Sequence, residues 1–224
     1  MKVLIFDSGP LINLSMNGLL YVLEELKKSF DGHFIITEAV KREVIDRPIN
    51  IERFELGALR VLDLLNRGIL EMPEILGVDK ARINEETYRL MQAANHALRF
   101  KSKAINIVSD AEMSCLALST ELNKRKIENM IAIDERTTRI IGEDPENLEK
   151  LMSEKVHHPV RLDIQNLKEF KDHRFIRSAE LVYVAYKKGI VNLEGKKVLE
   201  ALIYAAKYKG SSISYDEINE LKKL

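Results

Sequence analysis

Short apolar runs alternate along this chain with longer segments in which apolar residues recur at helical spacing. The runs are typical of strands buried on both faces, and the longer segments predict amphipathic helices. The predicted strands are 3–6, 34–36, 69–72, 130–133 and 159–162. The predicted helices are 17–28, a segment that begins after Thr37, 54–65, 84–98, 109–123 and 146–154. This alternation predicts a three-layer α/β/α fold with a mostly parallel central sheet.

The last quarter of the chain has a different pattern. From about residue 174 only helices are predicted, over 176–188, over 193–209 and from Ser214 onward. Ser214 and Glu217 have the spacing of a capping box. Five of the seven tyrosines are concentrated here: Tyr183, Tyr186, Tyr204, Tyr208 and Tyr215. We therefore predict an α/β domain over 1–163 and a C-terminal all-helical extension over 164–224.

Composition narrows the class of protein. The single cysteine, Cys115, excludes a disulfide within the chain and a zinc site built from cysteines. The chain has no run of eighteen apolar residues and does not begin like a signal peptide, so we expect a soluble, cytoplasmic protein without a membrane segment. The 35 Lys and Arg residues balance the 35 Asp and Glu residues. This balance argues against a general nucleic-acid coat, but not against an enzyme that grips nucleic acid locally.

Two acidic residues directly follow predicted buried strands. Asp7 comes after the run VLIF, and Asp134 comes after the run MIAI. Ligands of parallel α/β sheets bind beyond the carboxyl ends of the strands, and neighbouring strands lie about 4.8 Å apart. If the two strands are adjacent, both carboxylates are near enough to share a cation. The alternative is that each aspartate only begins a loop.

Two further acids lie on predicted helices, and each also has an ordinary structural explanation. Glu43 lies beside a buried helical stripe, which would aim it at the same crevice, or it pairs with Arg47 one turn later. Asp110 begins a predicted helix. There it either faces Asp7 or only stabilises the helix, because a negative charge is favourable at the positive end of the helix dipole. Glu112 completes a capping-box pattern with Ser109.

Four segments in this order resemble the PIN-domain family of metal-dependent nucleases: VLIFDSGPLINL, IITEAVKREV, VSDAEMSCLALSTEL and MIAIDERTTR. The resemblance covers about residues 1–143. It implies that Asp7, Glu43, Asp110 and Asp134 are catalytic and hold Mg²⁺ or Mn²⁺, with Glu112 as the other candidate for the third ligand. It also implies that Ser8, Thr37, Arg136 and Arg139 contact the substrate.

The same resemblance implies a function, namely hydrolysis of RNA phosphodiester bonds by an endoribonuclease. Prokaryotic proteins of this kind are often toxins of type II toxin–antitoxin pairs, so the implied partners are RNA, a small antitoxin protein and a second copy of the chain in a homodimer. Two alternatives stay open. One is a ribonuclease that processes cellular RNA without an antitoxin, and the other is a non-catalytic PIN-like scaffold that binds RNA or protein.

Overall fold

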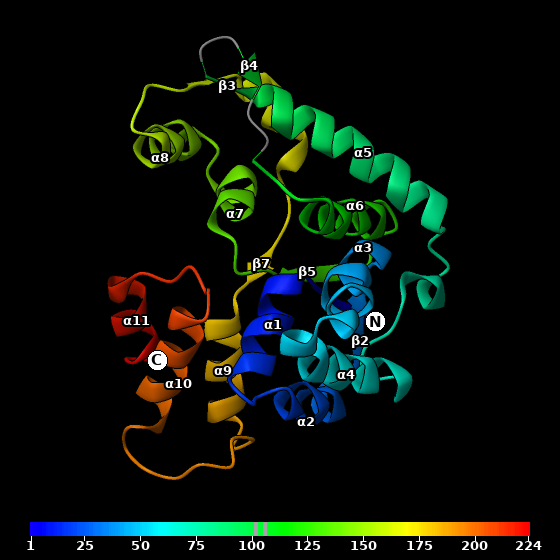
Figure 1. The fold of residues 1–224 in the computed structure, drawn as a ribbon, viewed down its shortest axis with the longest axis vertical. Coiled ribbons are helices and arrows are strands. Elements are labelled where there is room, and N and C mark those ends of the chain that lie inside the picture. The colour runs from blue at the N-terminus through cyan, green and yellow to red at the C-terminus, as the bar shows by residue number, and fades with distance from the viewer. Residues whose placement is uncertain (101–102, 105–106) are drawn as a thin grey trace.

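A computed structural model describes residues 1–100, 103–104 and 107–224. Its main sheet has four parallel strands in the order β2-β1-β5-β7 (Figure 1). These strands span Lys2–Phe6 (β1), Gly32–Ile36 (β2), Glu128–Ala132 (β5) and Phe175–Ile176 (β7). Strand β1 pairs along its whole length with β2 on one side and with β5 on the other. The first strand of the chain is therefore central, which explains why Val3–Phe6 are all apolar and buried.

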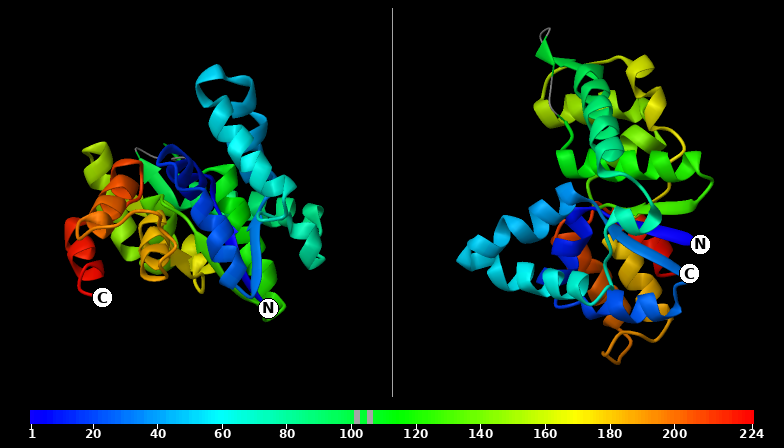
Figure 2. Two further views of the ribbon diagram at one scale, coloured as in Figure 1. Left: turned by 90° about the horizontal axis from the view of Figure 1, so that it is seen from below. Right: turned by 90° about the vertical axis from the view of Figure 1, so that its right-hand side faces the viewer.

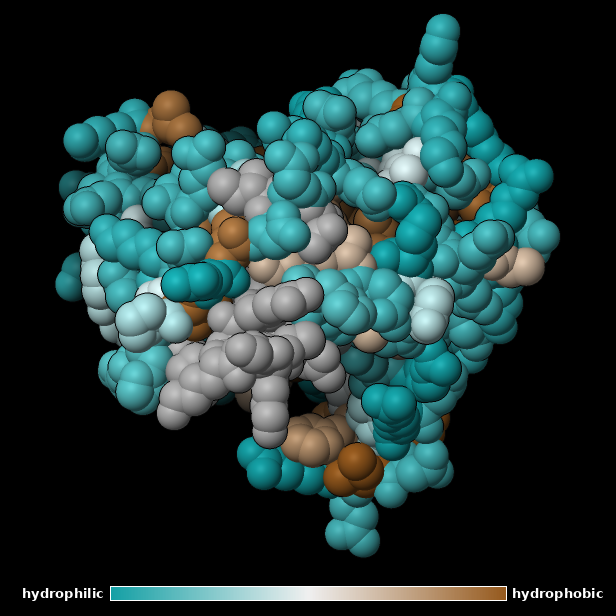
Figure 3. Space-filling view, turned by 90° about the horizontal axis from the view of Figure 1, so that it is seen from above, coloured by the Kyte–Doolittle hydropathy of each residue, from teal (hydrophilic) through white to brown (hydrophobic). Residues whose placement is uncertain are grey.

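Helices cover both faces of the sheet, and this arrangement confirms the predicted three-layer α/β/α class (Figures 1 and 2). One face carries α5 (Lys80–Ala97), α6 (Asp110–Lys124) and α7 (Arg136–Glu143), with α8 (Glu146–Val156) beyond them. The other carries α1 (Ser8–Met16), α2 (Tyr21–Ser29), α4 (Glu52–Asn66) and α9 (Ser178–Lys187). The short helix α3 (Glu38–Lys41) packs against α6. Seen from above, the surface is mostly hydrophilic, with scattered apolar side chains (Figure 3).

Helix α1 begins immediately after Asp7 and was not predicted. Gly9 and Pro10 resemble turn residues in the sequence. Pro10 nevertheless stands in the first turn of the helix, where a backbone N–H has no partner within the helix and none is lost. The consequence is that Asp7 caps a helix instead of beginning a loop.

Three strand predictions need correction. The segment 69–72 contributes a single bridge, between Glu71 and Ile35. Strand β6 (Arg161–Leu162) belongs to a second, antiparallel sheet with β3 (Leu98–Phe100) and β4 (Lys103–Ala104). Strand β7 lies in the region predicted to be only helical, and it pairs with β5. The predicted domain boundary at residue 163 therefore does not coincide with a break in the main sheet.

The rest of the extension is helical, as predicted. After α9 come α10 (Val198–Tyr208) and α11 (Tyr215–Leu221), and the capping box at the start of α11 forms between Ser214 and Glu217. Helix α9 packs against α1, α2 and α10. In the part of the chain that the structure describes, no helix is long and apolar enough to cross a membrane.

A buried polar network ties β7 to the sheet. The hydroxyl of Ser119 donates to Asn129 Oδ1 over 2.6 Å, so His173 Nδ1, at 2.9 Å, donates to that hydroxyl. His173 Nε2 is then an unprotonated nitrogen, and it is buried without a hydrogen-bond partner. Burial lowers the pKa of His173 from 6.5 to about 4, although the charge of Asp172 partly opposes this. Protonation of Nε2 would put a charge where nothing accepts its hydrogen bond.

We expect this histidine to make the fold weaken in mild acid. Below pH 6.5 the unfolded chain binds a proton at this residue that the folded chain binds only near pH 4, so the contribution of His173 to the free energy of unfolding falls as pH falls through this window. The slope is at most about 1.4 kcal/mol per pH unit. Urea unfolding of the parent and of His173→Asn between pH 6.5 and 5.0 measures it. If the free energy of unfolding changed equally with pH in the two proteins, His173 would not be the buried neutral group described above.

Candidate active site

The carboxyl ends of β1 and β5 bring Asp7 and Asp134 to the same edge of the sheet. Phe6 is paired with Ala132, and the backbone N–H of Asp7 donates to the Ala132 carbonyl over 2.9 Å. Both acids flank Gly9: a Cβ added there would lie 3.5 Å from Asp7 Oδ2 and 3.4 Å from Asp134 Cβ. The two aspartates are therefore neighbours, as the order of strands and acids predicts.

Asp7 is a buried carboxylate with one unpartnered oxygen. Its side chain is the N-cap of α1, and Oδ2 accepts a hydrogen bond of 3.3 Å from the Gly9 N–H. Oδ1 is buried without a partner, and the residue is only 3% exposed. The pKa of Asp7 is raised from 3.8 to about 7. Burial is the largest cause and the negative charge of Glu112 is the next, while the backbone N–H groups of Ser8 and Gly9 partly oppose the rise. A buried carboxylate with a raised pKa and an unpartnered oxygen is stabilised by binding either a proton or a cation.

Glu112 is the acid with the strongest electrostatic effect on Asp7. It completes the capping box with Ser109, whose N–H donates to Glu112 Oε2 over 3.1 Å. The Thr138 hydroxyl donates to the same oxygen over 2.7 Å. Burial raises the pKa of Glu112, while these two donors oppose the shift. Both donors bind Oε2, and neither of them uses the other carboxylate oxygen. Glu112 can therefore cap α6 and still act on Asp7.

Glu43 lies on a π-helical turn, Arg42–Asp46, that follows α3. Such turns insert one extra residue into a helix and are frequent at functional sites. The charge of Glu43 contributes to the raised pKa of Asp7. The buried thiol of Cys115 has a pKa raised first by burial and then by the charges of Asp7, Glu112 and Glu43. The charges of these three carboxylates therefore act on the same buried groups.

Asp110 does not belong to this group of acids. Its side chain is 54% exposed, and Arg42 Nη2 donates to its Oδ2 over 2.9 Å. The two carboxylates whose charges most affect the pKa of Asp7 are instead Glu112 and Glu43. The expectation that Asp110 faces Asp7 is not met, because the helix start turns Asp110 toward solvent and Glu112 toward the sheet. Of the two candidates for the third acid, the structure brings Glu112 beside Asp7.

Asp134 is adjacent to Asp7, but its carboxylate faces the C-terminal extension, where Ser178 begins α9. Oδ1 accepts hydrogen bonds from the Ser178 N–H over 2.9 Å and from the Ser178 hydroxyl over 3.0 Å. Oδ2 accepts from Asn13 Nδ2 over 3.3 Å. Burial raises the pKa of Asp134, and these donors oppose the rise. Asp134 thus fastens α9 to the edge of the sheet, and only part of its hydrogen-bonding capacity is free for another ligand.

Sequence reasoning missed Ser178 and Asn13. Asn13 carried a usable signal, since a polar residue within the apolar stretch PLINL predicts a buried amide that needs partners. Its Nδ2 also donates to the Ala206 carbonyl of α10 over 2.8 Å. Ser178 carried no such signal, because its partner is distant in sequence.

The predicted substrate contacts fall into two groups. Thr37 caps α3, the helix predicted to begin after it, and its buried hydroxyl lies 2.6 Å from the Ser114 hydroxyl. Ser8 is the half-buried first residue of α1. Arg136 is exposed, and Arg139 donates weakly to the Ser212 carbonyl over 3.5 Å. Both arginines line a groove of about 690 Å³ between α7 and α8 on one side and α10 and α11 on the other. The two arginines line this groove together with Glu143 and Glu217, whereas the Thr37 hydroxyl is engaged in structural contacts.

The donor set suits a hard divalent cation, because all three clustered groups are carboxylates. As the side chains stand, no group of three or more His, Cys, Asp or Glu residues within the described ranges could hold a metal ion directly. The orphaned Oδ1 of Asp7 is the one observation that points to a cation. In comparisons with known proteins, no family model matches the chain, and no curated protein or solved structure is significantly similar to it.

Proposed function

We propose that this chain is a PIN-like, Mg²⁺- or Mn²⁺-dependent endoribonuclease whose metal site is centred on Asp7. The observation that carries the proposal is the buried, unpartnered Oδ1 of Asp7, with the charges of Glu112 and Glu43 close by. A buried carboxylate oxygen without a partner, acted on by the negative charges of two further carboxylates, is costly unless a cation offsets their charge. The order of the acids in the chain, through the resemblance to PIN domains, supports the same proposal.

The side chains fit a hydrated ion better than a fully protein-bound one. Mg²⁺ keeps several waters and is usually held by one or two carboxylates. Asp7 would bind it directly, and Glu43 and Glu112 would bind its waters. When bound, such an ion lowers the pKa of an attacking water and stabilises the leaving oxygen. Asp134 would hold α1, through Asn13, and α9 in place, and Arg136 and Arg139 would hold the RNA backbone.

The biological role is a finer proposal that rests on the resemblance alone. A toxin role, with a small antitoxin and a homodimer in the cytoplasm, stays a prediction, as does processing of a cellular RNA. No feature of the described residues favours a scaffold over an enzyme.

A cleavage assay tests the proposal. Purified protein at pH 8 is incubated with labelled single-stranded RNA and with DNA of the same sequence, with Mg²⁺, with Mn²⁺ or with EDTA. We expect cleavage of RNA with either metal and none with EDTA. Cleavage that persists in EDTA, or no cleavage of any RNA with either metal, would count against the proposed function.

A further inference from the structure

The start of helix α4 projects from the body of the molecule (Figure 2). Every residue from 51 to 56 is exposed there, and so is Leu59. We call residues 48–60 the α4 arm. Of the thirteen exposed large apolar side chains in the described residues, six lie on the arm and on the adjoining helix α1: Ile51, Phe54, Leu56, Leu59, Ile12 and Met16. Exposed apolar side chains gathered in this way indicate a surface that contacts another molecule.

A groove of about 440 Å³ lies at the base of the arm. Leu59, Arg60 and Leu64 of α4 line one side of it, and the end of α1 and the start of α2 line the other. Ile51, at the tip of the arm, precedes Arg60 by about two and a half helical turns. A second arm lying antiparallel to the first would place its tip at this groove and would receive the first tip in its own groove. A two-fold symmetric dimer requires reciprocal contacts of this kind.

Charged side chains on the arm are self-complementary in the same way. Glu52, Leu56 and Arg60 follow one another at four-residue spacing, so they lie along one face of α4. Within the described residues, all ion pairs of this helix involve Arg67, so Glu52 and Arg60 have no charged partner there. If a two-fold axis passes beside Leu56, Glu52 of one copy lies opposite Arg60 of the other, and this pair forms twice. In a parallel arrangement each charge would instead face its own equal.

We propose that two copies of this chain form a dimer through their α4 arms, which pack antiparallel and cross at Leu56. The apolar side chains would form the centre of the contact, and the two pairs of Glu52 with Arg60 would lie at its rim. A second copy is the occupant that these observations favour, because the arm carries both the tip and the groove, and both the acid and the base. An unrelated protein would need only one member of each pair on this chain. The inference does not depend on the proposed nuclease activity.

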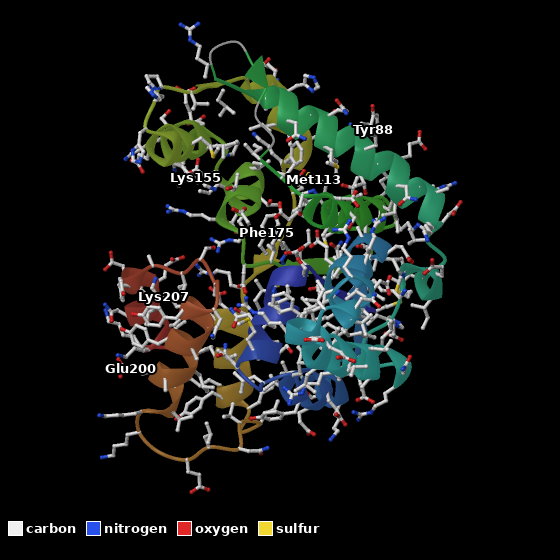
Figure 4. The ribbon with its side chains drawn as sticks, viewed as in Figure 1. Tyr88, Met113, Lys155, Phe175, Glu200 and Lys207 are labelled. Atoms are coloured by element: carbon white, nitrogen blue, oxygen red, sulfur yellow. The ribbon has the colours of Figure 1, made fainter. Side chains whose placement is uncertain are left out.

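The mass of the full chain in solution tests the proposal, and multi-angle light scattering measures it over a range of micromolar concentrations. The parent should have twice the mass of one chain. Leu56→Asp places a charge at the centre of the contact and should weaken the dimer about thirtyfold or more. The matched control is Tyr88→Asp on α5, where a comparably exposed ring points into solvent (Figure 4). This control should keep the mass of the parent.

Charge reversal tests the antiparallel arrangement. Arg60→Glu sets acid against acid at both rim contacts, and Glu52→Arg sets base against base, so each variant alone should dimerise about tenfold or more weakly than the parent. An equal mixture of the two variants should form a dimer again, because each supplies the charge that the other has lost. Both residues are exposed, so neither change disturbs the core, and melting curves check that the fold is kept.

The dimer and the nuclease can fail separately. A parent that stays monomeric at every concentration overturns the dimer, even if another protein binds the arm. A dimer that Leu56→Asp leaves intact, or a mixture of the two reversed variants that does not form one again, contradicts the α4 arm as the contact. RNA cleavage by a monomeric parent would remove the dimer and keep the nuclease, and a dimeric parent that does not cleave RNA would do the reverse.

Discussion

Asp7→Asn should abolish metal-dependent RNA cleavage and at the same time stabilise the metal-free protein. Loss of the proposed direct ligand removes several kcal/mol of charge stabilisation, which corresponds to a rate reduction of about a thousandfold or more. The asparagine can still cap α1, since its side-chain oxygen can accept from the Gly9 N–H as Oδ2 of Asp7 does. The fold should therefore persist, and single-turnover cleavage with Mn²⁺ measures the loss.

The gain in stability has a separate physical cause. The pKa of Asp7 is about 7 in the folded chain and near 3.8 in the unfolded one, so ionisation weakens the fold as pH rises from 3.8 through 7. Above pH 7 the neutral asparagine avoids a cost of up to about 4 kcal/mol. Thermal unfolding at pH 8 in EDTA should show a higher Tm for Asp7→Asn than for the parent. Adding Mn²⁺ should raise the Tm of the parent only.

A lower Tm for the variant in EDTA, combined with unchanged cleavage, would show that Asp7 is a structural cap and nothing more. The pH dependence offers an internal check. Metal must displace a proton from Asp7, so the apparent Mn²⁺ affinity of the parent should rise with pH up to about 7 and then level off.

Glu112→Gln and Asp110→Asn should have very different effects on cleavage. Glu112 is half-buried beside Asp7, and loss of a charge that would hold metal-bound water should cost about 10–100-fold in activity. Asp110 is exposed and pairs with Arg42, so its neutralisation should change the rate less than twofold and the stability by less than about 1 kcal/mol. Both variants keep the shape of the side chain, which makes them matched controls for one another.

The reverse ranking, with Asp110→Asn inactive and Glu112→Gln active, would show that the start of α6 is arranged differently when substrate or metal is present. Glutamine can still accept from Thr138 and from the Ser109 N–H, so the capping box is retained. Melting curves of both variants check that a loss of activity is not a loss of fold.

The sequence predicted the fold class and the meeting of Asp7 with Asp134 because both depend on simple rules. Buried runs form central strands, and the acids that follow neighbouring parallel strands share an edge. The direction of the Asp134 side chain depends instead on Ser178, 44 residues away in sequence. Only the docking of the tail decides it, and no local pattern reports that docking.

The sequence did not decide between Asp110 and Glu112 for a different reason. A helix reveals which face is buried when apolar and polar residues alternate, but α6 is buried over almost all of its length. The apolar residues of α6 therefore do not mark a single buried face, and the sequence does not show whether Asp110 or Glu112 points inward. Glu43 was placed beside a buried stripe, yet its actual position also depends on the π-helical turn at 42–46, which the sequence does not announce.

Direct titration with Mn²⁺ at pH 8, followed by the loss of the free-ion signal in electron paramagnetic resonance, tests the central claim without any substrate. The parent should bind Mn²⁺, Asp7→Asn should bind it at least about tenfold more weakly, and Asp110→Asn should bind it like the parent. Equal binding by the parent and Asp7→Asn, or no binding by the parent at millimolar Mn²⁺, would contradict the assignment of Asp7 as the centre of a metal site.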